Sequence, residues 1–172
     1  IVHRLDKDTS GLIIIAKNNK AHEFISQQIK SRDIKKRYIA LVHGVPKASQ
    51  AFIEAPIGRH PNLRKKMAII SNGKVAKTFY RILEAFDDCA LLEIDLITGR
   101  THQVRVHLAS IGHPVVSDDL YGSNMDMLGR QFLHASMLEF KLPRNGDLVK
   151  LNCDLPSDLN LFLDKITING QI

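Results

Sequence analysis

The apolar residues of this chain come in short runs, and several of these runs alternate with polar residues. Alternation over roughly four to eight residues is typical of a strand with one buried face. The pattern predicts strands in the middle of the chain, at residues 38–42, 51–57, 67–70, 75–83 and 90–97. Later runs at 132–140 and 148–153 predict two more strands. So many half-buried strands favour a sheet that is largely antiparallel.

Helical spacing is confined to three segments. Residues 21–32 place apolar side chains on one face, directly after an apolar run at 12–16 that we predict as a buried strand. Residues 101–111 favour a second helix, with Thr101 available as its N-cap. A last helix is expected to begin at Pro156 and the two residues that follow it.

These elements predict a single α+β domain over residues 1–172, with a mixed, largely antiparallel sheet and flanking helices. At 44% hydrophobic and 24% charged residues, the composition is that of a globular protein. Cys89 and Cys153 stand alone, which predicts buried thiols and no metal site. The apolar runs are too short to cross a membrane and no signal segment is visible, so we expect a cytoplasmic protein without a membrane partner.

The formal net charge is +6 and the isoelectric point is about 9.4, which suits a polyanionic partner. The basic residues gather at 30–37, 59–66 and 74–81. Two interpretations stay open from charge alone: a solvated face that keeps the protein soluble, or a surface that follows phosphates.

The first polar cluster covers residues 3–12. In one interpretation, residues 8–11 form a surface turn and Asp6 pairs with a neighbouring cation. In the other, the turn holds Asp6 at a strand edge as a carboxylate nucleophile or base. A hydrolase that combines Asp6 with Asp8, or with the pair Asp118 and Asp119, is a further alternative. The neighbours Asp118 and Asp119 make a poor pair for it, because adjacent residues of an extended segment point in opposite directions.

Two more clusters carry candidate site residues. Tyr38 lies in a basic surround at the start of a strand, either as an inward aromatic or as a platform on which a base stacks. Arg100, His102 and Arg105 crowd the start of a predicted helix, where cations are disfavoured. Departures from local preference often mark functional sites. Arg105 is expected on a flanking face of that helix, either solvated or directed at a carboxylate or phosphate.

Together these segments resemble the RluA-type family of pseudouridine synthases. The motifs that carry the resemblance are HRLDxxTSGL at 3–12, KxYxAxVxG at 36–44, GRTHQxRVH at 99–107 and Leu-His-Ala at 133–135. The family's upstream strand and its S4-type RNA-binding domain have no counterpart here. We therefore expect the chain, which opens on Ile1, to be N-terminally incomplete.

The resemblance implies an isomerase that converts uridine to pseudouridine in a structured RNA without any cofactor. It implies the catalytic residues Asp6, Tyr38 and Arg105, with Arg105 paired to Asp6. Tyr38 is implied to stack on the base and is a candidate acceptor of the ribose 2′ proton. It implies the substrate-binding residues Arg4, Arg100, His102 and Leu133. It also predicts that Arg105→Met loses activity while the fold is preserved.

The partner implied by the resemblance is RNA. The segment Gly58-Arg59-His60-Pro61 is similar to the branch that acts on large-subunit ribosomal RNA, which makes ribosomal RNA processing the first expectation. Transfer RNA is a second possible substrate within the family, and a non-catalytic RNA-binding module is the alternative function. The family also suggests a monomer.

Overall fold

The computed structural model describes residues 1–122 and 128–170. Its helices are α1 (Asn19–Ser31), α2 (Gln103–Ser110) and α3 (Ser157–Asn169). Its strands are β1 (Ser10–Gly11), β2 (Lys35–His43), β3 (Gln50–Glu54), β4 (Ile57–Arg59), β5 (Met67–Ile69), β6 (Lys77–Ala85), β7 (Cys89–Leu96), β8 (Leu133–Lys141) and β9 (Leu148–Asn152).

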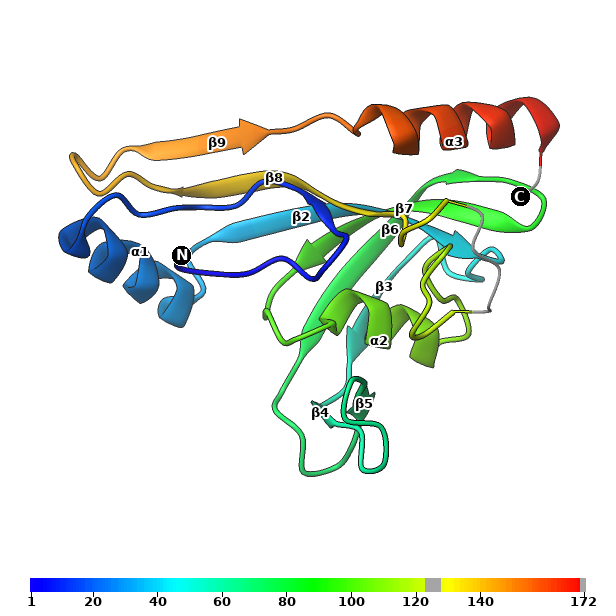
Figure 1. Cartoon of the computed structure of the whole chain (residues 1–172), viewed down its shortest axis with the longest axis horizontal. Helices are drawn as coiled ribbons and strands as arrows, with labels where there is room; N and C mark the ends of the chain where they lie inside the picture. Colours follow the sequence, from blue (N-terminus) through cyan, green and yellow to red (C-terminus); the bar gives the residue numbers. More distant parts are fainter. Residues whose placement is uncertain (123–127, 171–172) are drawn as a thin grey trace.

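Seven of the strands form one sheet in the order β1-β8-β2-β7-β6-β3, and β9 also pairs with β8. β1 runs parallel to β8, whereas the other pairs of this sheet are antiparallel. This mixed, mostly antiparallel sheet with its helices confirms the predicted α+β class. The separate β4–β5 hairpin projects from the body, and α1 and α3 lie toward opposite ends of the sheet (Figure 1).

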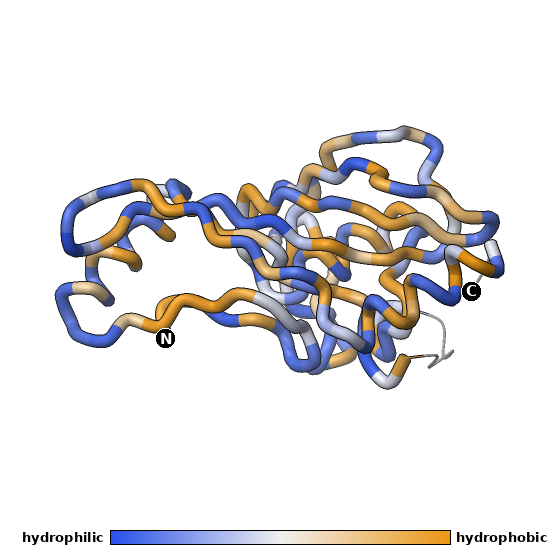
Figure 2. Tube along the Cα trace, turned by 90° about the horizontal axis from the view of Figure 1, so that it is seen from above, coloured by the Kyte–Doolittle hydropathy of each residue, from blue (hydrophilic) through white to orange (hydrophobic). Residues whose placement is uncertain are grey.

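The core lies around β2, which runs between β7 and β8. Ala40, Leu41 and Val42 are all fully buried. Because successive side chains of a strand point to opposite faces, both faces of the sheet must be covered there. α2 and α3 contribute to the same core, for example through Val104 and Leu159. Toward the ends of the strands, hydrophilic and hydrophobic residues alternate along the chain (Figure 2).

The strand predicted at residues 12–16 is wrong, because the structure has a strand only at Ser10–Gly11. The backbone amide of Leu12 still donates to the Ala135 carbonyl at 2.9 Å, but Ile13 and Ile15 are exposed. The reason lies in β9, which pairs with β8 from residue 137 onward and so occupies the edge that a longer β1 would need.

Several strands have other bounds than predicted, and β2 begins at Lys35 instead of residue 38. The run at 51–57 is divided between β3 and β4, since the chain leaves the main sheet at Ala55 and Pro56. The run at 75–83 becomes a strand only at Lys77, and Val75 before it is exposed. Among the described residues, none of the helices combines the length and the apolar character of a membrane span.

Candidate active site

Asp6 lies in the turn that precedes β1, and its side chain is partly exposed. Its carbonyl accepts a hydrogen bond from the amide of Thr9 at 3.1 Å. The side-chain amide of Gln131 donates to the carbonyl of Lys7 at 2.7 Å and to the Thr9 hydroxyl at 3.0 Å. The turn is therefore held from outside by a residue far along the chain, which orients Asp6 as a site residue requires.

β1 fixes this turn against β8. The Ser10 hydroxyl lies 2.9 Å from Nδ1 of His134, whose Nε2 lies 3.1 Å from the carbonyl of Cys153. Gly11 has a φ of +111°, and a Cβ atom there would lie 2.2 Å from the carbonyl oxygen of Ala135. Only glycine allows β1 and β8 to approach so closely with this backbone conformation.

Arg105 projects from α2 and is 3% exposed. Its Nη1 lies 3.7 Å from Oδ2 of Asp6, so the predicted pair of arginine and aspartate is present as an ion pair. Nε and Nη2 donate to Asp118 at 2.7 Å each. Of the two alternatives for Arg105, the solvated one is wrong and the one directed at a carboxylate holds, because this bidentate bond allows the guanidinium to be buried.

Asp118 was considered in the sequence analysis only as half of a poor carboxylate pair and was missed there as the partner of Arg105. Its side chain is fully buried, and Oδ1 also accepts hydrogen bonds from the amides of Leu120 and Tyr121 at 3.0 and 3.1 Å. Asp119 is 86% exposed at its side chain, so the two neighbours do point in opposite directions. The signal that could have found Asp118 is a lone buried arginine, which requires a carboxylate partner.

The charge of Arg105 has further support. Its Cζ lies 5.2 Å from the ring centre of Tyr121, within the range of a cation–π contact. Burial disfavours the charged form, but the bonds to Asp118 and the charges of Asp118 and Asp6 outweigh it and raise the pKa of Arg105. The guanidinium is thus a permanent cation with one nitrogen directed at Asp6.

Tyr38 is 8% exposed and lies on β2 close enough to Asp6 to feel its charge. Burial, together with that negative charge, raises the pKa of Tyr38 to about 12. The phenol therefore keeps its proton at neutral pH, where a general base would have to be free of it. This favours stacking or hydrogen-bond donation over proton acceptance.

The start of α2 differs from the prediction in its cap. Thr101 is not the N-cap, a position that His102 takes with a left-handed φ of 54° and without a side-chain bond. Gln103, the first residue of the helix, instead binds the loop before α2 and strand β6. Its Oε1 accepts from the Thr98 hydroxyl at 2.7 Å and from the Arg100 amide at 3.0 Å, and its Nε2 donates to Thr78 at 2.9 Å.

The predicted substrate-binding residues differ in burial and in their hydrogen-bond partners. Nδ1 of His102 lies 2.8 Å from the hydroxyl of Tyr121, and burial lowers the pKa of this histidine. Nε of Arg100 donates to the Val75 carbonyl at 3.0 Å. Arg4 is exposed, whereas Leu133 at the start of β8 is 2% exposed and belongs to the core.

The hydrolase alternative and a metal site find less support in the described residues. Asp8 is exposed and pairs with Lys7 at 3.8 Å, so it offers Asp6 no buried carboxylate partner. No three His, Cys, Asp or Glu side chains are grouped to hold a metal ion in the parts of the chain at 1–122 and 128–170. Cys89 is buried as predicted, but Cys153 is only partly so.

Comparison with known proteins adds to this geometry. Residues 1–110 match the family model described as RNA pseudouridylate synthase. An uncharacterized RNA pseudouridine synthase of Chloroflexus aurantiacus is 46% identical over 168 residues, which covers 96% of this chain and 53% of that protein. A ribosomal large subunit pseudouridine synthase D of Nitrosomonas europaea is 46% identical over 175 residues, covering 96% and 51%. The chain thus spans about half the length of these relatives.

Two solved human structures share the fold. RNA Pseudouridylate Synthase Domain Containing 1 superposes with a TM-score of 0.82 at 29% identity, covering 99% of this chain and 81% of that one. RNA Pseudouridylate Synthase Domain Containing 4 gives a TM-score of 0.80 at 27% identity, with 96% and 75% covered. The similarity therefore extends beyond the residues that the family model matches.

Proposed function

The chain belongs to the RNA pseudouridylate synthase family, and we propose that it isomerises uridine to pseudouridine within a structured RNA. The observation that carries this proposal is the ion pair between Asp6 and the buried Arg105, with Tyr38 close to the same carboxylate. These three residues come from a loop, a helix and a strand that lie far apart in the sequence. Their convergence supports a shared chemical task.

The reaction breaks the bond between ribose C1′ and uracil N1 and joins the same base through C5. Atoms and electrons balance within the nucleotide, so the chain needs no outside group for it. We assign Asp6 to the sugar carbon as nucleophile or base, because its side chain is partly exposed while Arg105 is buried behind it. We assign Tyr38 to the face of the base, in accord with its retained proton.

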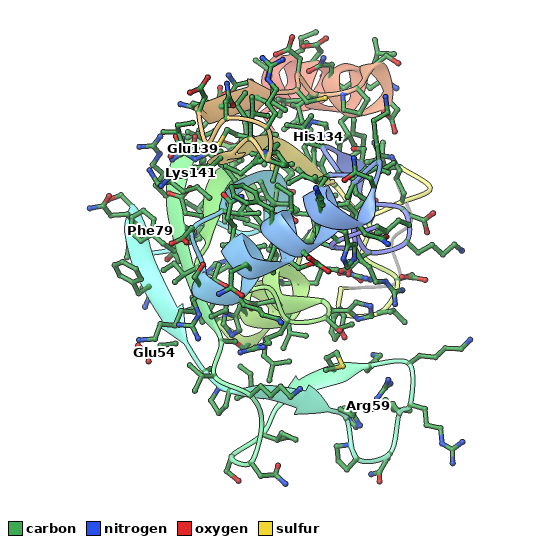
Figure 3. All side chains as sticks on the ribbon, turned by 90° about the vertical axis from the view of Figure 1, so that its left-hand side faces the viewer. Glu54, Arg59, Phe79, His134, Glu139 and Lys141 are labelled. Carbon is green, nitrogen blue, oxygen red and sulfur yellow. The ribbon has the colours of Figure 1, made fainter. Side chains whose placement is uncertain are left out.

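The uridine must leave its stack to reach Asp6, which costs a few kcal/mol. Contacts between the basic surface and RNA phosphates are available to offset this cost. Arg4 is exposed and free to take the place that the base vacates. The β4–β5 hairpin presents more basic residues, and Figure 3 shows Arg59 on this hairpin, away from the strand β8 that carries Glu139 and Lys141.

Large-subunit ribosomal RNA is the substrate that we propose. Support comes from relatives named ribosomal large subunit pseudouridine synthase D, which include the protein of Nitrosomonas europaea. The segment Gly58-Arg59-His60-Pro61, which lies at the β4 strand and just after it, adds the similarity noted in the sequence. Transfer RNA is the second candidate substrate, and pseudouridine mapping of both RNAs with and without the gene separates the two.

The decisive experiment measures tritium release from RNA labelled at uracil C5. The unaltered protein is expected to release tritium, whereas Asp6→Asn should release none and still bind RNA. Asp8→Asn is the matched control, because Asp8 is exposed and its left-handed φ of 66° suits asparagine as well. Release by the Asp6→Asn protein would remove the role of the carboxylate. If the unaltered protein binds RNA but releases nothing, the chain is a binding module instead.

A further inference from the structure

Lys36 carries a charge that none of the described residues compensates. Within residues 1–122 and 128–170, its ammonium group makes no hydrogen bond or ion pair. Its two neighbours on β2 are paired, Lys35 with Glu139 at 2.7 Å and Arg37 with Asp95 at 2.8 Å. Lys36 is also partly buried, and burial lowers its pKa. A desolvated cation without a partner costs free energy, so its retention needs a reason.

The position of Lys36 connects it with the candidate active site. Alternate residues of a strand share a face, so Lys36 lies on the same side of β2 as Tyr38. A Cβ atom at Gly99 would lie 3.7 Å from Nζ of Lys36. Burial and the charge of Lys36 lower the pKa of His3 to about 4. The ammonium therefore lies between the segment that carries Asp6 and the loop that leads to α2.

A hollow of about 260 Å³ opens at the same place, where β2 begins and β7 ends. Four basic residues line it together with one carboxylate, that of Asp95, which is already bound to Arg37. The other basic residues are Arg32, Lys35 and Lys36. Like Lys36, the exposed Arg32 makes no ion pair within the described residues; it ends α1 with a left-handed φ of 64°. Among the residues that line the hollow, Lys36 and Arg32 are thus the two uncompensated cations, and this excess of positive charge suits an anion.

We propose that Lys36 and Arg32 bind a backbone phosphate of the RNA at the start of β2, beside the candidate active site. The proposal rests on the proposed function, since RNA supplies the phosphate. A phosphate oxygen would give the Lys36 ammonium the partner that it lacks. The free energy lost by keeping this cation unpaired in the free protein is then recovered when the RNA binds.

The test compares the salt dependence of RNA binding for the unaltered protein and Lys36→Met. The probe is a fluorescein-labelled RNA hairpin with uridines in its loop, and Kd is measured by fluorescence anisotropy at several KCl concentrations. Loss of one phosphate contact should reduce the slope of log Kd against log salt by about 0.7 to 0.9. Arg32→Gln should reduce the slope by a similar amount.

Lys35→Met is the matched control, because it removes the same charge from the adjacent residue. Its ammonium is already paired with Glu139, so we expect its slope to stay that of the unaltered protein. Thermal unfolding without RNA gives a second measurement. Lys36→Met should unfold at the same or a higher temperature than the unaltered protein, because it removes an unpaired cation, whereas a structural role for Lys36 predicts a lower temperature.

Each other result would overturn the proposal. Equal reductions in slope for Lys36→Met and Lys35→Met would mean that only the overall charge matters. An unchanged slope for Lys36→Met, with thermal stabilisation by inorganic phosphate that this variant abolishes, would mean a site for free phosphate. Salt slopes do not depend on turnover, so a failure of the synthase function would appear in the tritium assay alone.

Discussion

At the scale of single residues, the candidate active site depends most on which carboxylates the three guanidinium nitrogens of Arg105 contact. Two nitrogens bind the fully buried Asp118, and the third lies 3.7 Å from Asp6. A bidentate bond fixes the plane of a guanidinium, so Asp118 determines the direction in which Arg105 meets the carboxylate of Asp6. Arg105 therefore serves the fold and the site together.

Replacing Arg105 tests this dual role. Arg105→Met leaves Asp118 as an uncompensated buried charge, which typically costs about 3–5 kcal/mol. We expect the free energy of unfolding in urea to fall by that amount, in addition to a loss of activity. The sequence alone predicted that the fold would survive this change.

A surface arginine provides the control. Arg81 pairs with Glu93 but is 49% exposed at its side chain, so Arg81→Met should cost no more than about 1 kcal/mol. If Arg105→Met were as stable as Arg81→Met while losing activity, Arg105 would be a purely catalytic residue and the prediction from the sequence would be right.

At the scale of elements, the two-residue strand β1 is short but determines where Asp6 lies. It attaches the turn that carries Asp6 to β8, and it does so with the backbone of Gly11 in contact with Ala135. A side chain at Gly11 would have to displace backbone atoms of a central strand. A substitution in β1 should therefore displace Asp6 although Asp6 itself is unchanged.

We expect Gly11→Ala to destabilise the protein and to lower pseudouridine formation. The left-handed backbone alone costs roughly 1–2 kcal/mol with alanine, and the contact at 2.2 Å adds to it. Gly112→Ala isolates the backbone part, because Gly112 has a φ of +83° but nothing within 4 Å of an added Cβ. Chemical denaturation of both variants checks the difference. Equal losses would show that the close approach to β8 is unimportant.

At the scale of the whole molecule, several histidines are neutral in the folded protein. Burial lowers the pKa of His3, His43, His102 and His107, and that of His3 falls to about 4. In the unfolded chain a histidine takes up its proton near pH 6.5. Between that value and about pH 4 the unfolded chain therefore binds more protons than the folded one, and stability falls as the pH is lowered.

This linkage predicts a thermal midpoint that decreases as the pH falls from neutral to about 4. Nε2 of His3 accepts a hydrogen bond from the Ile14 amide at 2.9 Å, so protonation would break a contact of the N-terminal segment. We expect His3→Gln to weaken the pH dependence in this window, and His22→Gln, on the exposed face of α1, to leave it unchanged. A pH profile that His3→Gln does not alter would contradict the assignment.

The sequence by itself determined the residues that can do chemistry and the periodicity of most strands and helices. Asp6, Tyr38 and Arg105 stand in motifs that are local, and alternation along a strand depends only on neighbouring residues. These features need no knowledge of distant contacts. The periodicity sufficed for the α+β class, whereas the pairing of Arg105 with Asp6 was implied by the resemblance to a known family.

Only the tertiary structure decided which distant residues pair with these side chains and strands. It ended β1 at Gly11 because β9 occupies the edge of β8, and it buried Arg105 because Asp118 lies against it. It also left Lys36 without a partner among the described residues, between two neighbours that are paired. Each of these outcomes depends on which distant segments contact one another in the folded protein. The spacing of residues within one segment does not determine those contacts.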